Sequence, residues 1–301
     1  MGKIYKDFVR SINPYGYLAH LGLYNKVSDE KYIERAFMYM MGYKINLSAP
    51  KTFNEKLQWL KLYDRRPEYI KMVDKYEVKK YVAECIGEEY IIPTLGVWSS
   101  YDSIEFDKLP NQFVLKCTHD SGGLVLVKDK KEMNKNLIKR KINKCFRRNY
   151  FWVGREWPYK DVRPRIIIEK YMEEDGHTPF DYKIFCFNGE PKVVLVCRDR
   201  FTESGLTEDF YSEKWEHLQV RRPTHPNANE IIKKPKELEE MLRLAKVLAE
   251  DIPFVRVDFY TIEGKVYFGE LTFYPASGFN GFEPKEYDEI FGEWLQLPVG
   301  N

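Results

Sequence analysis

Alternating polar and apolar residues form the clearest pattern in this chain, close to its C-terminus. Residues 253–262 and 266–273 are both rich in aromatic and β-branched side chains, and the segment 263–265 between them contains a glycine. Side chains alternate between the two faces of a strand, and a short loop with glycine is typical of a tight turn. The pattern therefore predicts an antiparallel β-hairpin.

Two carboxylates of this hairpin are predicted to face each other. A three-residue loop places Asp258 opposite Glu270 and, one pair further on, Arg256 opposite Thr272. Facing carboxylates repel, and a divalent cation between them would explain the pair. An exposed sheet face with unrelated charges is the alternative. The metal interpretation is favoured because the opposite face of the hairpin is apolar, with Val257, Phe259, Leu271 and Phe273.

Helical and strand patterns alternate along the rest of the chain. Residues 1–70 are tyrosine-rich and mostly helical in pattern, whereas residues 199–230 are polar and irregular. Hydrophobic periodicity and capping residues predict helices over 28–42, 52–62, 74–82, 130–148, 235–249 and 287–295. Apolar runs bounded by glycine, proline and Asn188-Gly189 predict strands within 91–98, 113–127, 165–172 and 181–198.

A lysine and a glycine-containing turn lie in the predicted hairpin 113–127. Lys116 comes at the end of a buried apolar run, where an ammonium group is costly unless an anion meets it. The small residues after it, up to Gly123, have backbone N–H groups that could bind phosphate oxygens. A turn between two strands is the simpler interpretation of this loop alone, and no Walker A motif occurs. With the facing carboxylates, these residues predict magnesium and an anionic, phosphorylated ligand.

The composition narrows the class of protein. The chain has 301 residues, of which 44% are hydrophobic and 31% charged, enough for two or three packed subdomains. A net charge of +2 gives no reason to expect nucleic acid as a partner. The five cysteines show no CxxC spacing, which argues against a zinc site or a disulfide framework and fits the cytoplasm. No apolar run is long enough to span a membrane.

Two segments in the middle of the chain leave their roles open. The predicted helix 130–148 carries many lysines and arginines, for which a solvated face is favoured over a surface for anionic sugar or lipid carriers. The aromatic segment 149–161 follows it and is interpreted as a loop on the substrate side of a site.

Taken in order, these segments resemble the ATP-grasp superfamily, and within it the TupA-like proteins of bacterial surface-polysaccharide gene clusters. The resemblance covers about residues 50–295 and is most specific in 113–123, 168–172, 256–258 and 268–272. It implies an α+β fold in which two α+β subdomains grip ATP. The implied division is a mostly helical N-terminal segment, a lid subdomain and a C-terminal metal and catalytic subdomain, at 1–73, 74–170 and 171–301.

The resemblance also implies which residues bind ATP. Lys116 resembles the lysine on the phosphates. The flexible phosphate loop corresponds to His119, Ser121, Gly122 and Gly123. The hinge that reads adenine through its backbone corresponds to Glu169, Lys170, Tyr171 and Met172. Asp175, or Glu173 in its place, is the implied ribose ligand.

The implied metal and catalytic residues lie on two hairpins. Asp258 and Glu270 resemble the magnesium carboxylates, and Thr272 takes the position where the family usually has an asparagine ligand. Arg256 resembles the arginine that stabilises the acyl phosphate and the tetrahedral intermediate. Lys183, which shares a strand face with Asp181, resembles the second basic residue over the phosphates.

The function implied by the resemblance is ATP-dependent ligation of a carboxylate to an amine through an acyl phosphate, with ATP and Mg²⁺ as cofactors. The closest branch implies that the acid is a hexuronate of a surface or capsular polysaccharide, or of its nucleotide-sugar precursor. The partners would be this uronate and an amine or amino acid, with peripheral contact to membrane glycan assembly.

Three other classes remain as alternatives. A sugar kinase is disfavoured because no HRD motif occurs and Asp258-Phe259-Tyr260 lacks the glycine of DFG. A glycosyltransferase of polysaccharide biosynthesis is disfavoured by the lack of a DxD dyad, although metal-free types need none. A non-catalytic nucleotide-binding partner would have no need for Arg256, Asp258 and Glu270 together.

Overall fold

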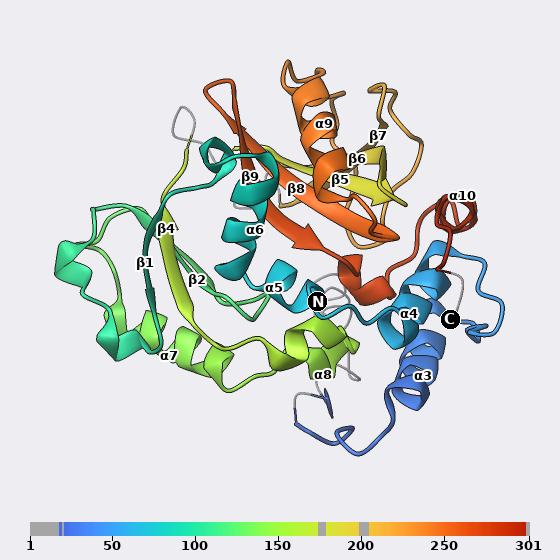
Figure 1. Ribbon diagram of the computed structural model, residues 1–301, viewed down its shortest axis with the longest axis horizontal. Helices are drawn as coiled ribbons and strands as arrows, with labels where there is room; N and C mark the ends of the chain where they lie inside the picture. The colour runs from blue at the N-terminus through green and yellow to red at the C-terminus, as the bar shows by residue number, and fades with distance from the viewer. Residues whose placement is uncertain (1–17, 20, 174–178, 199–204, 299–301) are drawn as a thin grey trace, which may run out of the picture.

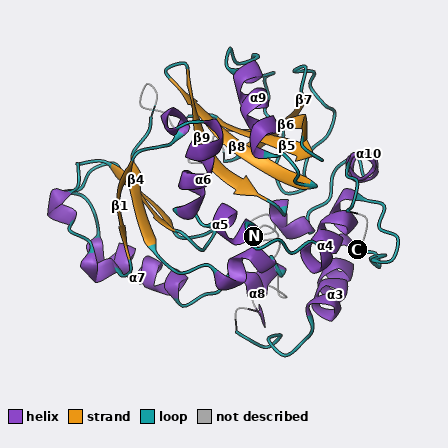
Figure 2. Cartoon of the chain, in the orientation of Figure 1, coloured by secondary structure: helices purple, strands orange, loops and turns teal. Residues whose placement is uncertain are grey.

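The computed structural model describes residues 18, 19, 21–173, 179–198 and 205–298. Figure 1 shows one β-sheet at the left and a second at the upper right, and Figure 2 shows the helices that surround them. In the described chain the first sheet has four strands and the second has five, and all neighbouring strands are antiparallel. This mixture of helices and antiparallel sheets agrees with the predicted α+β class.

The first sheet has two different faces. Its strands, in spatial order, are β1 (Thr94–Trp98), β4 (Ile166–Lys170), β2 (Phe113–Cys117) and β3 (Leu124–Val127). One face packs against helix α7 (Lys135–Phe146), with Leu115, Ile142 and Ile168 fully buried between them. The other face carries Lys116 and Glu169, because the β2–β4 register pairs Lys116 with Ile167 and Val114 with Glu169. Lys116 and Glu169 therefore point away from α7.

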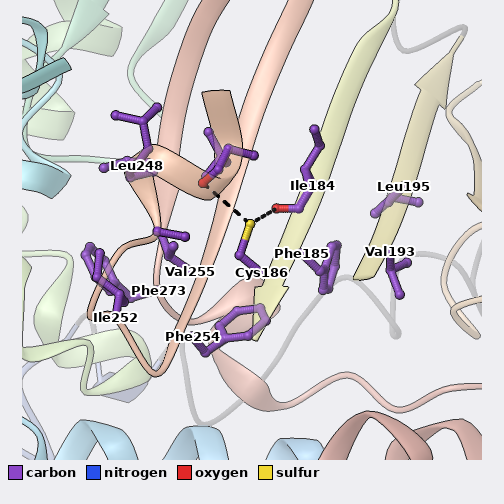
Figure 3. Close-up of a cluster of buried hydrophobic side chains, with 14 of the residues drawn as sticks. Ile184, Phe185, Cys186, Val193, Leu195, Leu248, Ile252, Phe254, Val255 and Phe273 are labelled. Atoms are coloured by element: carbon purple, nitrogen blue, oxygen red, sulfur yellow. Dashed lines mark hydrogen bonds between the residues drawn. The ribbon is translucent and has the colours of Figure 1, made fainter. Parts of the chain in front are cut away.

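The second sheet is the larger one and carries the predicted hairpin. Its strands, in spatial order, are β7 (Thr207–Ser212), β6 (Glu190–Arg198), β5 (Asp181–Phe187), β8 (Phe254–Ile262) and β9 (Lys265–Thr272). Helix α9 (Leu238–Leu248) covers one face, where Ile184, Cys186 and Val255 pack in Figure 3. The thiol of Cys186 hydrogen-bonds to the carbonyls of Ile184 and Ala245, which joins strand to helix.

The opposite face of the second sheet is apolar at one end and charged at the other. At the apolar end Phe185, Phe187 and Phe254 pack around Phe53 of helix α4 (Phe53–Tyr63). The other helices of the described residues are α3 (Asp29–Met41), α5 (Tyr69–Val73), α6 (Glu77–Ile86), α8 (Phe151–Gly154) and α10 (Glu286–Trp294). Short 3₁₀ helices lie at Glu88–Tyr90, Tyr101–Ser103, Phe106–Lys108, Trp157–Asp161 and Pro275–Gly278. Helix α4 thus packs on the apolar end of this face, and the charged residues lie at the other end.

The β8–β9 hairpin has the predicted pairing of Asp258 with Glu270 but a shorter turn than predicted. Its turn has two residues, Glu263 (φ 51°) and Gly264 (φ 74°), so the predicted three-residue loop is wrong. A bulge at Gly269 restores the register, and Asp258 faces Glu270 as predicted. A Cβ atom on Gly269 would lie 3.0 Å from the Tyr260 ring and 3.1 Å from the Asp258 carbonyl oxygen. The glycine therefore holds the register of the two carboxylates.

Two further differences from the sequence analysis concern the second sheet. The segment predicted as irregular contains strand β7, whose four central residues are all buried, including Glu208 and Asp209. Because charged and apolar residues are buried alike, no alternation marks this strand.

Helix α6 begins after the predicted boundary at residue 74, but Val78 and Val82 belong to the core of the second sheet. The boundaries 1–73, 74–170 and 171–301 remain a prediction, and residues 1–17 and 20 lie outside the described structure.

The apolar prediction for the hairpin is confirmed: Val257, Phe259, Leu271 and Phe273 are all buried, with exposed fractions of at most 3%. Among the described residues, no helix combines the length and apolarity that crossing a membrane requires.

Candidate active site between the two sheets

A guanidinium group joins the two facing carboxylates of the hairpin. Arg256 donates from Nε to Oδ1 of Asp258 at 2.6 Å and from Nη2 to Oδ2 at 2.7 Å. The same Nη2 lies 3.0 Å from both Oε1 of Glu270 and Oγ1 of Thr272. A cation therefore already lies between the carboxylates and offsets their repulsion, although the charge of Glu270 still acts to raise the pKa of Asp258. The sequence places these four residues correctly but does not show the reach of the arginine.

Lys183 adds a second cation on the neighbouring strand. It is opposite Asp258 in the β5–β8 register, and its Nζ forms ion pairs with Asp258 and, at 2.7 Å, with Asp181. Burial raises the pKa of Asp258 to about 6, although Arg256 and Lys183 oppose this shift. The charged side chains of this group are the carboxylates of Asp181, Asp258 and Glu270 and the cations of Arg256 and Lys183. The carboxylates outnumber the cations by one, so the group can accept a further positive charge.

Glu270 is the accessible carboxylate of the group. Its side chain is 43% exposed, whereas that of Asp258 is 1% exposed. Burial acts to raise the pKa of Glu270, but Arg256 and then Lys183 outweigh it and bring the pKa to about 2. Lys75 and Lys116 contribute in the same direction. The charged ends of the two sheets are therefore near enough to interact.

The donors fit a magnesium ion that is shared with phosphates. In the described part of the chain, no group of three or more His, Cys, Asp or Glu side chains could hold a metal by itself. Mg²⁺ commonly takes only one or two protein carboxylates and completes its octahedron with water and phosphate oxygens. Glu270 is open to such an ion, with the Thr272 hydroxyl 3.3 Å from its Oε1. Asp258 would join only by exchanging one of its cationic partners.

The half-buried Lys116 of the first sheet forms an ion pair with a buried carboxylate. Nζ of Lys116 lies 2.6 Å from Oε2 of Glu169, and Lys79 of α6 pairs with Oε1. Glu169 is 4% exposed, and Lys116 and Lys79 lower its pKa against the effect of burial. The need for an anion near Lys116 was thus predicted correctly, but the protein supplies one itself. Lys79 was not predicted, since nothing in its helix distinguishes it from the exposed lysine that follows.

The predicted phosphate loop lies beside these lysines. Ser121 and Gly122 are exposed, whereas Gly123 is buried and its carbonyl accepts from the backbone N–H of Cys117 at 2.8 Å. Asp120 bonds Lys75 through its carbonyl, at 2.9 Å, and forms an ion pair with Arg148. The ring of His119 lies under α7 instead of at the loop tip, because its Nε2 is 3.2 Å from the Cys145 carbonyl oxygen.

The predicted hinge follows strand β4. The backbone N–H of Lys170 donates to Pro93 at 2.9 Å, while Tyr171 and Met172 form no backbone hydrogen bond within the described chain. Their free backbone groups fit a segment that reads an adenine edge. Glu173 is exposed, and Asp175 lies outside the described residues.

A buried network next to Glu270 was not predicted. Oγ of Ser277 donates to Oε1 of Glu156 at 2.5 Å, and Glu156 is 4% exposed. Nζ of Lys61 donates to the carbonyls of Ser277 and Gly154 at 2.6 and 2.7 Å. Burial raises the pKa of Glu156, and the charge of Glu270 adds to this. Ser277 has a left-handed backbone (φ 54°), which is strained for a serine, and only the folded chain brings these residues together.

A second buried arginine lies beyond Arg256. Arg222 is 8% exposed, and its Nε is 3.9 Å from Oε2 of Glu208 on β7. Burial lowers the pKa of Arg222, and the charge of Arg256 also lowers it while Glu208 and Asp258 act in the opposite direction. Arg222 falls in a polar segment without periodicity, so its proximity to the charged hairpin was not predicted.

A comparison with known protein families identifies the family of the chain. The family model described as TupA-like ATPgrasp matches residues 55–296. The chain belongs to the TupA-like ATP-grasp family. This membership confirms the predicted family and the α+β ATP-grasp fold. Proteins of this superfamily are ATP-dependent ligases that use Mg²⁺, the two cofactors implied by the sequence.

Solved structures with similarity to the chain include three ligases. D-alanine–D-alanine ligase from Bacillus anthracis, complexed with ATP, is 20% identical, with 67% of this chain and 54% of that chain covered and a TM-score of 0.39. The corresponding ligase from Helicobacter pylori is 19% identical, with 81% and 69% covered and a TM-score of 0.39. The ATP-grasp ligase PsnB, complexed with a phosphomimetic variant of its minimal precursor, Mg and ADP, is 10% identical, with 69% and 52% covered and a TM-score of 0.40.

The chain spans about half the length of the B. anthracis ligase and of PsnB. A search of curated proteins finds no match.

Proposed function

We propose that this protein is an ATP- and Mg²⁺-dependent ligase that joins a carboxylate to an amine. The observation that carries the proposal is the meeting of two charged sheet faces in a TupA-like ATP-grasp chain. Lys116 on one face contributes to the low pKa of Glu270 on the other, so the two charges lie within electrostatic range of each other. A nucleotide triphosphate with its metal is such a group, because its phosphates need cations and its metal needs carboxylates.

The nucleotide is assigned to the first sheet. Lys116 takes the phosphates, and Lys79 keeps Glu169 neutralised when it does so. The exposed backbone of Ser121 and Gly122 covers the phosphates, as P-loop-like turns do with their N–H groups. Tyr171 and Met172 take the adenine edge through their free backbone groups.

The metal is assigned to the hairpin of the second sheet. Glu270 and the Thr272 hydroxyl would hold Mg²⁺, and Asp258 would join them after exchanging one of its cationic partners. The ion supplies charge neutralisation to the phosphates. Arg256 positions both carboxylates through its hydrogen bonds at 2.6–3.0 Å, and its charge favours the anionic groups that develop at the reacting carbon.

The chemistry balances with ATP as the co-substrate. A carboxylate oxygen of the acid bonds to the γ-phosphorus as the bond to ADP breaks, which gives an acyl phosphate. The amine nitrogen then attacks the acyl carbon, the C–O bond to phosphate breaks, and the amine proton leaves to a base or to water. Lys183 lies beside Asp258, where it stabilises negative charge in both steps.

The acid is proposed to be a hexuronate of a surface polysaccharide or of its nucleotide-sugar precursor, and the amine a small amine or amino acid. The resemblance to proteins of polysaccharide gene clusters supports this choice. We place the reaction in the cytoplasm, where ATP is available, with peripheral contact to membrane glycan assembly.

The test is a panel of uronic acids and amines assayed for ADP and phosphate, with mass spectrometry of the products. With hydroxylamine as the amine, the expected product is a hydroxamate, formed only with ATP and Mg²⁺. Glu270→Gln should lower turnover by orders of magnitude, while Glu230→Gln, an exposed carboxylate remote from the hairpin in sequence, serves as the control. A stable phosphorylated sugar would make the protein a kinase. Sugar transfer without ATP would make it a glycosyltransferase.

A further inference from the structure

A basic cavity lies on the α7 side of the phosphate loop. Its volume is about 410 Å³, and its walls come from the C-terminal end of α7, the segment 159–164 and the ring of His119. Four of the lining side chains are permanently or normally cationic, namely Arg147, Arg148, Lys160 and Arg163, whereas Asp161 is the one acidic residue in the lining. The cavity is thus a positively charged space of a size that accepts a small ligand.

Two of these cations have no ionic partner. Arg147 and Arg163 are exposed, and neither forms an ion pair with any other described residue. Like charges gathered around one space repel unless an anion joins them. A guanidinium group binds a carboxylate through two parallel N–H donors. The geometry therefore provides for an oxyanion from outside the described chain.

One buried residue of the cavity lining has a polar atom without a hydrogen-bond partner. His119 is 3% exposed, and its Nδ1 has no hydrogen-bond partner among the described residues. Its Nε2 lies 3.2 Å from the Cys145 carbonyl oxygen, which accepts only from a protonated nitrogen. In the neutral ring, this leaves Nδ1 as an acceptor, and burial lowers the pKa of His119, which favours that neutral form. An acceptor beside the cations suits a hydroxyl group next to the oxyanion.

An aromatic residue connects the cavity with the active site. Tyr159 lines the cavity, and its pKa is raised by burial and by the charges of Glu156 and Glu270. Its ring lies 5.0 Å from that of Tyr150, whose hydroxyl hydrogen-bonds Ser121 of the phosphate loop. The pair of tyrosines therefore connects the cavity with the phosphate loop of the active site.

We propose that the cavity binds an acidic saccharide unit, with its carboxylate on Arg147 and Arg163 and a hydroxyl on His119. This proposal rests on the proposed function and specifies its substrate: the acid is presented within an oligosaccharide that carries a second uronate beyond the reacting one. A free phosphate ion has the oxyanion but lacks the hydroxyl-bearing ring, so it should bind more weakly.

The test is calorimetric titration of the full-length protein with a hexuronate tetrasaccharide, a neutral glucose tetrasaccharide and inorganic phosphate. The double variant Arg147→Gln/Arg163→Gln should lose at least tenfold in affinity for the acidic tetrasaccharide. Arg140→Gln, an exposed arginine on the same helix but outside the cavity lining, is the matched control and should bind as the wild type does. ATP should bind all three proteins equally. The neutral tetrasaccharide should not bind.

Two results would overturn the proposal: equal affinity of the double variant and the wild type for the acidic tetrasaccharide, or phosphate binding as tightly as that tetrasaccharide. Its failure is separable from that of the ligase function. Charge-dependent saccharide binding without any ATP-dependent product would refute the ligase and leave the cavity assignment standing. Ligation with an unchanged KM for the tetrasaccharide in the double variant would do the reverse.

Discussion

Replacing Glu270 by glutamine tests the hydrogen bonding at the centre of the site. The variant keeps the shape of the side chain but removes the charge that Nη2 of Arg256 contacts at 3.0 Å. A hydrogen bond to a charged group contributes about 1.5–3 kcal/mol. Because the Glu270 side chain is 43% exposed, solvent screening reduces this to about 1 kcal/mol. Without ligand, the variant should therefore melt about 2 °C below the wild type, given roughly 2–4 °C per kcal/mol for domains slightly smaller than this chain.

The stability difference between the wild type and Glu270→Gln should depend on pH. The pKa of Glu270 is about 2 in the folded protein, where Arg256 and Lys183 outweigh burial, against an ordinary value of 4.5. A carboxylate with a lowered pKa stabilises the fold at pH values above its unfolded pKa, and this stabilisation is lost as the pH falls. The difference between wild type and variant should thus be full at pH 7 and should shrink as the pH falls from about 4.5 toward about 2.

Ligand should widen the difference. At a concentration of 100 times Kd, Mg-ATP stabilises the wild type by about 2.7 kcal/mol, whereas the variant lacks the open metal carboxylate and gains less. The assay is a set of melting curves in chelator and in Mg-ATP for wild type, Glu270→Gln and the control Glu230→Gln. A variant that is as stable as the wild type in chelator would refute the bridging role of Arg256. Equal gains from Mg-ATP would remove Glu270 from the metal site.

Three further substitutions test other parts of the structure. Lys116→Met should weaken ATP binding by about 1.5–3 kcal/mol in calorimetry, with the fold retained because Lys79 still pairs with Glu169; unchanged affinity would exclude Lys116 from the phosphates. Burial raises the pKa of Asp288 to about 6 despite hydrogen bonds from Asn54, so its stabilising effect is complete below pH 3.8 and is lost as the pH rises through about 6. Asp288→Asn should therefore gain stability relative to the wild type between pH 4 and pH 8, by up to about 3 kcal/mol in denaturant titrations; a constant difference would contradict the shift. Gly269→Ala should destabilise the fold by about 1–3 kcal/mol and impair turnover, since its Cβ meets the Asp258 carbonyl oxygen; an unchanged melting temperature would show that the bulge tolerates a side chain.

The sequence predicts best where one periodicity governs a whole segment. The alternation in 253–273 places Asp258 opposite Glu270 even though the loop length was wrong, because a one-residue bulge compensates for the shorter turn. The same pattern alone would predict that Glu270→Gln raises the stability of the fold, because two facing carboxylates repel. Only the structure shows that the guanidinium of Arg256 reaches both carboxylates, so that the substitution is expected to lower the stability.

The residues that were missed depend on contacts between distant segments. Lys79 on α6 meets Glu169 on β4, and Ser277 meets Glu156 across more than a hundred residues. No local pattern marks a polar residue that will be buried by a partner so far along the chain. The candidate lysines and carboxylates on strands were found because strand register can be derived from the sequence.

The central claim is that a carboxylate is activated by transfer of the γ-phosphoryl group of ATP and then joined to an amine. The most direct measurement uses a uronate labelled with ¹⁸O in its carboxyl group, incubated with Mg-ATP and an amine, followed by mass spectrometry of the released phosphate. Because the acyl C–O bond breaks in the second step, each released phosphate should carry one ¹⁸O atom and the amide should retain the other. Unlabelled phosphate together with an uronate that keeps both ¹⁸O atoms would contradict it.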